Sequence, residues 1–222
     1  MRLWLKENRG FLLFLVCFAF FRTAMADWNP VPSGSMRPTL LEGDVVLVNR
    51  LAYDFKLPLT DVSVARLGTP QRGDVVTFSS PRDGTRLIKR LIAVPGDVVE
   101  MRDERLLING VEARYDGERE VAEPDGFGGT MPAVRQDEEV AGSRRVVQWL
   151  PAIRAMRSFG PVQVPADSFF FLGDNRDNSA DSRYIGVVAR QLLIGRAHHI
   201  LVSVDTQGVW EPRLERFGAP LH

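Results

Sequence analysis

Cysteine and histidine are scarce in this sequence, and each scarcity excludes a class of site. The single cysteine, Cys17, excludes an intramolecular disulfide framework and a cysteine metal cluster. The three histidines, His198, His199 and His222, are too few for a histidine metal site and give no sign of a Ser-His-Asp triad. Basic and acidic residues number 28 each, so no overall positive field points to nucleic acid. We therefore expect no metal, no other cofactor and no nucleic-acid partner.

Lysine is also rare, and its rarity draws attention to one position. Of the 28 basic residues only Lys6, Lys56 and Lys89 are lysine, and all others are arginine. Arginine stays protonated in proteins, whereas a buried lysine can lose its proton near neutral pH. Lys89 lies in the apolar stretch 87–92. The residues alone leave two alternatives, an exposed lysine at a strand edge or a buried base.

A long hydrophobic run is absent as well. The apolar stretch Phe11 to Phe21 would span only about 17 Å of helix before Arg22, which is typical of a cleavable signal peptide. The sequence Ala24-Met25-Ala26 supplies a cleavage pattern for that case. Alternatively Arg22 snorkels and residues 11–26 form an anchor of about 24 Å. Basic residues at positions 2, 6 and 9 predict a cytoplasmic N-terminus.

What the chain does contain, beyond residue 40, is a β pattern. Gly-Asp-Val-Val occurs three times, beginning at Gly43, Gly73 and Gly96, each time as a turn before a β-branched run. The intervals are too irregular for a solenoid, so we interpret the repeat as shared turn chemistry. Further strands are expected at 86–94, 162–164 and 168–172, and Asn109-Gly110 predicts a tight hairpin. No helix longer than a few turns is expected after the N-terminal segment.

The stretch 112–160 differs in character from the rest. Residues 116–139 hold eight acids against two arginines, with several glycines and prolines between them. Such a charge run is typical of a solvated, partly irregular surface, and we assign it no chemistry. The apolar residues 146–150, which include Trp149, suggest that this insertion carries some core of its own.

Two polar stretches are candidates for a site. The first is Pro30 to Leu40, here called the Ser35 turn, in which three prolines and Gly34 form a stiff turn bearing Ser33 and Ser35. The second is Gly173 to Arg183, here called the Gly173 loop, with three acids and two arginines that could pair into a rigid support. Either stretch alone could equally be a linker or an ordinary polar loop.

Five motifs in order make the chain resemble the bacterial type I signal peptidases (leader peptidases), membrane-bound serine proteases with a Ser/Lys dyad. The motifs are Pro-Ser-Gly-Ser-Met-Arg-Pro-Thr-Leu from Pro32, Gly43-Asp44, Arg72-Gly73-Asp74-Val75-Val76, Ile88-Lys89-Arg90 with Pro95-Gly96-Asp97, and the Gly173 loop. With the strand pattern, the resemblance implies a mainly β fold: an antiparallel β catalytic domain (27–111 and 161–222) with a smaller β or irregular insertion (112–160). A cytoplasmic N-terminus (1–10) and one N-terminal transmembrane helix (11–26) complete the expected organisation.

The resemblance also implies roles for individual residues. Ser35 matches the nucleophile and Lys89 the general base, and an apolar setting would lower the pKa of Lys89 as that role requires. Ser33 matches the hydroxyl that stabilises the oxyanion, and Ser179 the one that orients the lysine. Further matching positions are a structural ion pair, Asp181 with Arg183, and residues lining the substrate pockets, namely Val31, Pro32, Met36, Leu40 and Ile88.

The expected function is removal of N-terminal signal peptides from exported preproteins, after small residues at positions −3 and −1. The resemblance implies a single-pass protein of the bacterial inner (cytoplasmic) membrane, in contact with phospholipid, with its catalytic domain on the periplasmic side. Three alternatives are a pilin-processing peptidase of conjugative transfer, a tethered domain that binds signal peptides without cutting them, and a self-cleaving repressor. The repressor would need a DNA-binding domain, for which there is no room before Pro30.

Overall fold

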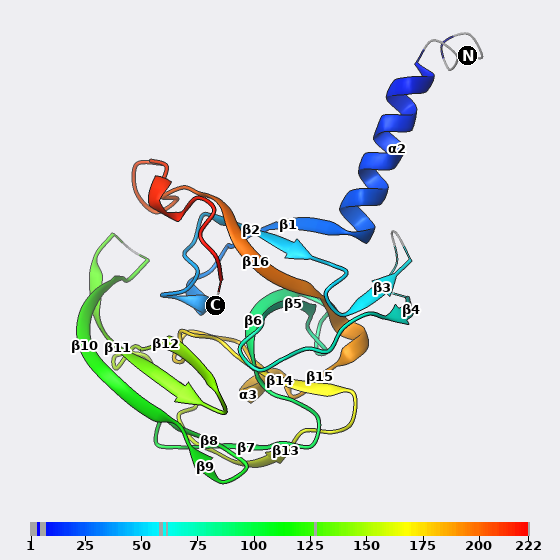
Figure 1. Ribbon diagram of the computed structural model, residues 1–222. Helices are drawn as coiled ribbons and strands as arrows, with labels where there is room; N and C mark the ends of the chain where they lie inside the picture. The colour runs from blue at the N-terminus through cyan, green and yellow to red at the C-terminus, as the bar shows by residue number, and fades with distance from the viewer. Residues whose placement is uncertain (1–3, 5–7, 58–59, 61, 127, 222) are drawn as a thin grey trace.

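The computed structural model describes residues 4, 8–57, 60, 62–126 and 128–221, and antiparallel strands dominate it (Figure 1). A seven-stranded sheet carries the regions that the motifs occupy, in the order β1-β2-β16-β5-β6-β14-β15. Its strands are β1 (Ala26–Pro30), β2 (Asp44–Asn49), β5 (Val75–Ser79), β6 (Arg86–Ala93), β14 (Ser168–Leu172), β15 (Val188–Ala189) and β16 (Leu193–Ser203). The mainly β fold that the sequence predicts is therefore confirmed.

Three smaller sheets and a few short helices complete the described part. A four-stranded sheet has the order β13-β7-β8-β9, a three-stranded sheet the order β10-β11-β12, and β3 pairs with β4. The bounds are β3 (Asp54–Lys56), β4 (Ser63–Arg66), β7 (Val98–Arg102), β8 (Arg105–Ile108), β9 (Val111–Glu112), β10 (Arg114–Pro124), β11 (Thr130–Val140), β12 (Ser143–Trp149) and β13 (Phe159–Gln163). The helices are α2 (Arg9–Ala24), α3 (Ser182–Ile185) and the 3-10 turns η1 (Gly34–Met36), η2 (Arg190–Leu192) and η3 (Leu214–Arg216).

The repeated Gly-Asp turns share one chemistry, as the sequence predicts. Each aspartate accepts a hydrogen bond from the backbone N–H three residues earlier: Asp44 from Leu41, Asp74 from Gln71 and Asp97 from Val94, at 2.8–2.9 Å. The preceding glycines have φ between +88° and +94°, where a side chain would be strained. The same small turn therefore begins β2, β5 and β7.

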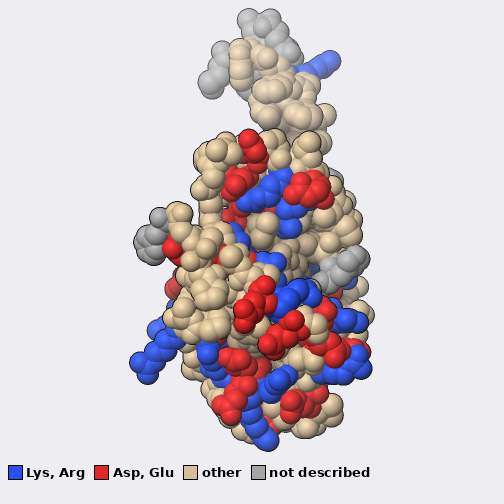
Figure 2. All heavy atoms as spheres, turned by 90° about the vertical axis from the view of Figure 1, so that its left-hand side faces the viewer, with Lys and Arg blue, Asp and Glu red and all other residues tan. Residues whose placement is uncertain are grey.

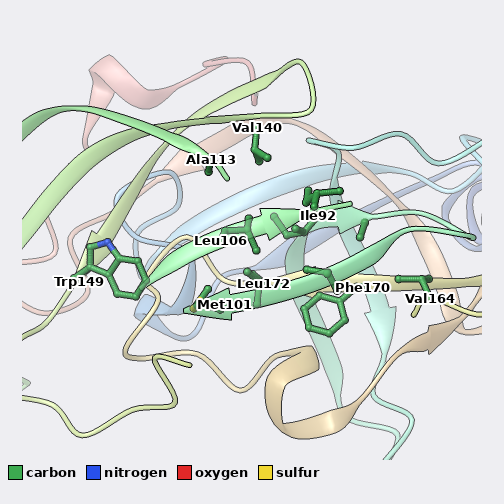
Figure 3. Close-up of a cluster of buried hydrophobic side chains, with 12 residues drawn as sticks. Ile92, Met101, Leu106, Ala113, Val140, Trp149, Val164, Phe170 and Leu172 are labelled. Carbon is green, nitrogen blue, oxygen red and sulfur yellow. The ribbon is translucent and has the colours of Figure 1, made fainter. Parts of the chain in front are cut away.

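The insertion is more regular than its composition suggests. Instead of a partly irregular surface, most of 112–160 forms the long strands β10, β11 and β12, with β10 and β11 eleven residues each. Strand β10 is mostly exposed, and β11 and β12 bury charged residues such as Glu138 and Arg145 beside apolar ones, so these sequences lack the apolar–polar alternation that marks a half-buried strand. The apolar residues of this stretch do not pack only among themselves, because Trp149 and Val140 lie in one cluster with Phe170 and Leu172 of the large sheet (Figure 3).

The acidic run is not simply a solvated surface. Figure 2 shows acidic and basic side chains interspersed over the visible face, as expected for a chain of zero net charge. Two of the acids, however, are buried: Glu138 is fully buried and Glu123 is 3% exposed. Each contacts two arginines. Burial of a carboxylate is tolerated only when such partners compensate its charge.

The N-terminal helix differs in its bounds from the expected anchor. Helix α2 covers Arg9–Ala24 and stands away from the β body, and Ala26 already belongs to strand β1, where it pairs with Asn49 (Figure 1). Within the described residues, no helix combines the length and apolar character needed to cross a membrane. The transmembrane helix expected at 11–26 is therefore not established by the structure.

Candidate active site

The Ser35 turn connects β1 to β2 and holds Ser35 in the 3-10 turn η1. Ser35 is 7% exposed, and Met36 beside it is fully buried. Two hydrogen bonds from Asn175 in the Gly173 loop fix the backbone of the turn. The backbone N–H of Asn175 donates to the Ser35 carbonyl oxygen at 3.2 Å, and its side-chain amide donates to the Gly34 carbonyl oxygen at 3.0 Å. The position of Ser35 is thus set by a segment 140 residues further along the chain.

Lys89 lies on strand β6 of the large sheet and contacts Ser35. Its Nζ donates to Ser35 Oγ at 2.7 Å and to the Ile88 carbonyl oxygen at 2.9 Å. Lys89 is 3% exposed, which excludes the alternative of an exposed lysine at a strand edge. Burial lowers the pKa of Lys89 to about 8, while Asp181 and Asp174 act in the opposite direction. A lysine with this pKa is partly neutral near physiological pH and can accept a proton.

Ser33 also faces the nucleophilic hydroxyl. Its Oγ donates to Ser35 Oγ at 3.4 Å, a long hydrogen bond, and Ser33 lies in an extended conformation at the exposed start of the turn. A serine hydroxyl can change partners by rotating about one side-chain bond. The sequence-predicted Ser33, Ser35 and Lys89 are therefore brought together.

The Gly173 loop packs directly against the turn. A Cβ on Gly173 would lie 2.5 Å from the Ser35 carbonyl oxygen and closer still to Ser179 Oγ, so only glycine fits there. Ser179 is buried, and its Oγ has no hydrogen-bond partner among the described residues. The structure thus brings Ser179 beside Gly173 but gives it no hydrogen bond to Lys89, so the expected orienting contact stays a prediction.

Ion pairs stabilise the Gly173 loop, and most of them join a loop residue to a residue outside the loop. Asp181 pairs with Arg183 at 2.8 Å, both side chains being fully buried. The other charged side chains reach outside: Asp174 to Arg90, Arg176 to Glu138, and Asp177 to Arg157, at 2.6–2.9 Å. The sequence-based idea of a support built from pairs inside the loop was therefore only partly right, because distant partners on β6 and β11 provide most of it.

Four of the five expected lining residues are packed together in one hydrophobic cluster. Val31, Met36 and Leu40 belong to one buried cluster, Ile88 packs against that cluster, and Pro32 is exposed beside it. Met36 and Leu40 have no exposed surface. They can therefore form the floor under a substrate side chain but not an open pocket wall.

Sequence reasoning missed two features of the region. Asn175 lies in a motif that the sequence singles out, yet nothing in the sequence marked it as the residue that holds the Ser35 backbone. Lys56 is also buried, at 5% exposure, and donates to the carbonyl oxygens of Gln191 and Leu193 at 2.7 Å. Rarity of lysine thus marks two buried positions, and only contact with a serine distinguishes Lys89.

Comparison with known proteins agrees with this geometry. Residues 4–202 match the family model described as "Signal peptidase, peptidase S26". Signal peptidase I of Pseudomonas fluorescens is 36% identical over 212 residues, covering 89% of this chain and 72% of the relative. The enzyme of the same name from Aquifex aeolicus is 34% identical and covers 86% of this chain and 82% of the relative.

A solved structure is also similar in sequence. The crystal structure of a signal peptidase I from Enterococcus faecalis is 33% identical to this chain, covers 58% of it and 96% of its own chain, and has a TM-score of 0.34. The family match itself extends over most of this sequence and includes Ser35, Lys89 and the Gly173 loop. The chain therefore belongs to the signal peptidase family, peptidase S26.

Proposed function

We propose that this protein is a serine endopeptidase that removes N-terminal signal peptides from exported preproteins, with Ser35 as nucleophile and Lys89 as general base. The single observation that carries the proposal is the 2.7 Å contact between Lys89 Nζ and Ser35 Oγ inside a buried site. Family membership supports the reaction, and the geometry supports the assignment of the two residues.

Acylation begins with the neutral form of Lys89. The amine takes the proton of Ser35 as Oγ attacks the carbonyl carbon of the scissile peptide bond, forming a tetrahedral intermediate. The ammonium then returns a proton to the leaving nitrogen as the C–N bond breaks. This leaves an ester between Ser35 and the signal peptide, and releases the mature protein with a new N-terminal amine.

Deacylation uses the same base a second time. Lys89, neutral again, takes a proton from a water molecule, whose oxygen attacks the ester carbonyl carbon. The proton passes to Ser35 Oγ as the ester bond breaks, and the signal peptide leaves with a free carboxyl group. Acylation and deacylation each begin with the neutral amine of Lys89, so its lowered pKa is part of the mechanism.

Ser33 is proposed to stabilise the oxyanion. Rotation of its hydroxyl away from Ser35 Oγ would place a donor beside the developing negative charge, together with the backbone N–H of Ser35.

Small residues at −3 and −1 of the substrate would contact Val31, Pro32 and Ile88, above the buried Met36 and Leu40. Ser179 is proposed to orient the ammonium group of Lys89, and the Asp181–Arg183 pair to support the loop.

We further propose that the protein acts at the phospholipid surface of the bacterial inner membrane, anchored by its N-terminal segment at 11–26. The catalytic domain (27–111 and 161–222) and the insertion (112–160) would then lie on the periplasmic side. The support is the apolar helix α2 leading directly into β1 of the sheet that carries the site. Recovery of native protein from cells with Asp27 as its first residue would contradict a retained anchor.

The test of the function is cleavage of a preprotein bearing an Ala-x-Ala site by the purified full-length protein in detergent. We expect a single cut after the −1 alanine, located by mass spectrometry, and no cut by Ser35→Ala. If both proteins bind the preprotein and neither cuts it, the proposal fails and a binding domain without activity is favoured. Cleavage of a pilin precursor alone, among several substrates, would instead favour a dedicated pilin peptidase.

A further inference from the structure

A cavity between the insertion and the Ser35 turn is lined mainly by arginine. It measures about 420 Å³, and five of its eight lining residues are Arg90, Arg119, Arg135, Arg144 and Arg145, with Pro38 and Thr39 of the Ser35 turn opposite. None of the lining residues is acidic. This is unexpected because 116–139 is an acidic stretch, yet both of its arginines, Arg119 and Arg135, line the cavity.

The strand register brings like charges face to face at the cavity. Arg119 on β10 and Arg135 on β11 are direct partners in the antiparallel pairing. Like charges directly opposite one another destabilise a sheet. Arg135 contacts Glu123 and Gln148, but Arg119 has no ion pair among the described residues and donates only to the Gly117 carbonyl oxygen. The fold thus maintains a repulsion that a bound anion would relieve.

The carboxylates behind the cavity do not neutralise its arginines. Glu138 is shared between Arg145 and Arg176, and Glu123 between Arg135 and Arg37. Arg144 is 3.5 Å from Asp137 and 61% exposed. Among the described residues, six guanidinium groups of this network form ion pairs with five carboxylates, those of Glu42, Glu123, Asp137, Glu138 and Asp174, and Arg119 adds a seventh guanidinium that has no ion pair. A local positive excess therefore exists on a chain without net charge.

From this arrangement we propose that the cavity binds a phosphate group. Several guanidiniums converge on one space, from the buried Arg90 and Arg145 at its floor to the exposed Arg119 and Arg144 at its rim. A tetrahedral phosphate has several acceptor oxygens and up to two negative charges, so it can bind several of these guanidinium groups at once. A single carboxylate, by contrast, binds one guanidinium group through two hydrogen bonds. The group could belong to free phosphate or to a phospholipid headgroup.

A bound phosphate would connect the insertion to the catalytic turn. Thr39 lies in the cavity wall and donates to Asp174 Oδ2 at 2.6 Å, and Arg90 pairs with the same carboxylate at 2.8 Å. The anion would therefore bridge β10 and β12 to the turn that carries Ser35. Such a bridge favours the folded state by binding it selectively.

The test compares thermal unfolding of the full-length protein in neutral detergent, with sodium phosphate titrated at constant ionic strength. The key variant is Arg119→Gln, and the matched control is Arg114→Gln on the same strand, whose side chain is 70% exposed and outside the cavity. Without phosphate, Arg119→Gln should melt no lower than the native protein, because it loses the repulsion with Arg135. Phosphate should raise Tm of the native protein and the control, with an affinity about tenfold weaker for Arg119→Gln.

Two further arms identify the source of the phosphate. Glycerol phosphate and micelles containing phosphatidylglycerol replace inorganic phosphate, with Arg144→Gln as a second variant should Arg119→Gln fail to fold. Equal responses to inorganic and glycerol phosphate would indicate a free-phosphate site, and a response to the lipid micelles alone a headgroup site. If the native protein responds to none of the three probes, or if both cavity variants respond as the native protein does, the proposal is overturned.

Discussion

Lys89 can serve as a base only while its amine is neutral. Its surroundings shift the pKa of that amine in opposing directions. Burial lowers the pKa, whereas the charges of Asp181 and Asp174 favour the ammonium form and limit the shift. The outcome, about 8, lies close to working pH. A shift from 10.5 to about 8 increases the neutral fraction at pH 7 roughly 300-fold. The same carboxylates would stabilise the ammonium that forms in the acylation step.

Ser33→Ala should slow catalysis without abolishing it. Loss of one oxyanion donor typically lowers kcat by about 10² to 10³, and Ser33 makes only a long contact in the free enzyme. Steady-state kinetics on a preprotein would measure this, with the exposed Ser63→Ala as control. An unchanged kcat with a raised KM would show that Ser33 contributes to substrate binding instead.

Gly173→Ala should nearly eliminate activity. The added methyl group would lie 2.5 Å from the Ser35 carbonyl oxygen and displace the turn, and such overpacking typically costs about 1–3 kcal/mol. Gly160→Ala is the matched control, since nothing lies within 4 Å of its added methyl group. Cleavage assays and thermal unfolding of both variants test this. An active Gly173→Ala protein would mean that the turn is not held as closely as described.

Among the secondary-structure elements, those that could be predicted have a characteristic pattern in their local sequence. The β-branched runs after each Gly-Asp turn predicted β2, β5 and β7, and Asn109-Gly110 predicted the β8–β9 hairpin, where both residues have positive φ. Strand β10 was not predicted because both of its faces are largely exposed, and β11 and β12 were not predicted because they bury charged residues such as Glu138 and Arg145. The ion-pair partners of Glu123 and Glu138 could not be predicted for another reason. They are distant in the sequence, and no local sequence pattern indicates which distant residues will pair.

The hairpin of β10 and β11 is tied to the Ser35 turn by one charged contact. Arg37, two residues after Ser35, donates to Glu123 at 2.7 Å and pairs with Glu42 at 2.8 Å, while Arg135 binds Glu123 from the other side. Glu123 is only 3% exposed, so its charge is weakly screened. The insertion thereby holds the segment that carries the nucleophile.

Glu123→Gln should therefore lower kcat by about tenfold or more, because small displacements of a catalytic group cost large factors in rate. The control is Glu120→Gln, an exposed position on the same strand. Rates should be measured well below the melting temperature, where a purely structural role would leave kcat unchanged. An unaltered kcat together with a lowered Tm would limit Glu123 to a structural role.

Across the whole molecule, buried ion pairs connect the insertion to the large sheet. Glu138 on β11 receives Arg145 from β12 and Arg176 from the Gly173 loop, and all three side chains are at most 2% exposed. The hydroxyl of Tyr115 donates to the same carboxylate at 2.7 Å. Together with the cluster around Trp149 and Phe170, this makes the insertion and the large sheet share both a core and a charge network.

Stability should therefore depend on the charge of Glu138. Burial opposes ionisation, but the two arginines prevail and hold the pKa of Glu138 far below its usual 4.5. A depressed pKa contributes stability that is present above pH 4.5 and is lost as pH falls further. Glu138→Gln should lower the free energy of unfolding at pH 7 by about 3–5 kcal/mol, because two arginines lose their partner. Urea unfolding should show this difference narrowing below pH 4.5, and a constant difference would contradict the linkage.

The central claim, that Lys89 is the general base for Ser35, is tested most directly by the pH dependence of kcat/KM for preprotein cleavage. Below the pKa of Lys89 the rate should rise about tenfold per pH unit, and it should level off near pH 8. Lys89→Arg, which keeps the charge but cannot release the proton, should be nearly inactive at every pH. A flat profile, or an active arginine variant, would contradict the claim.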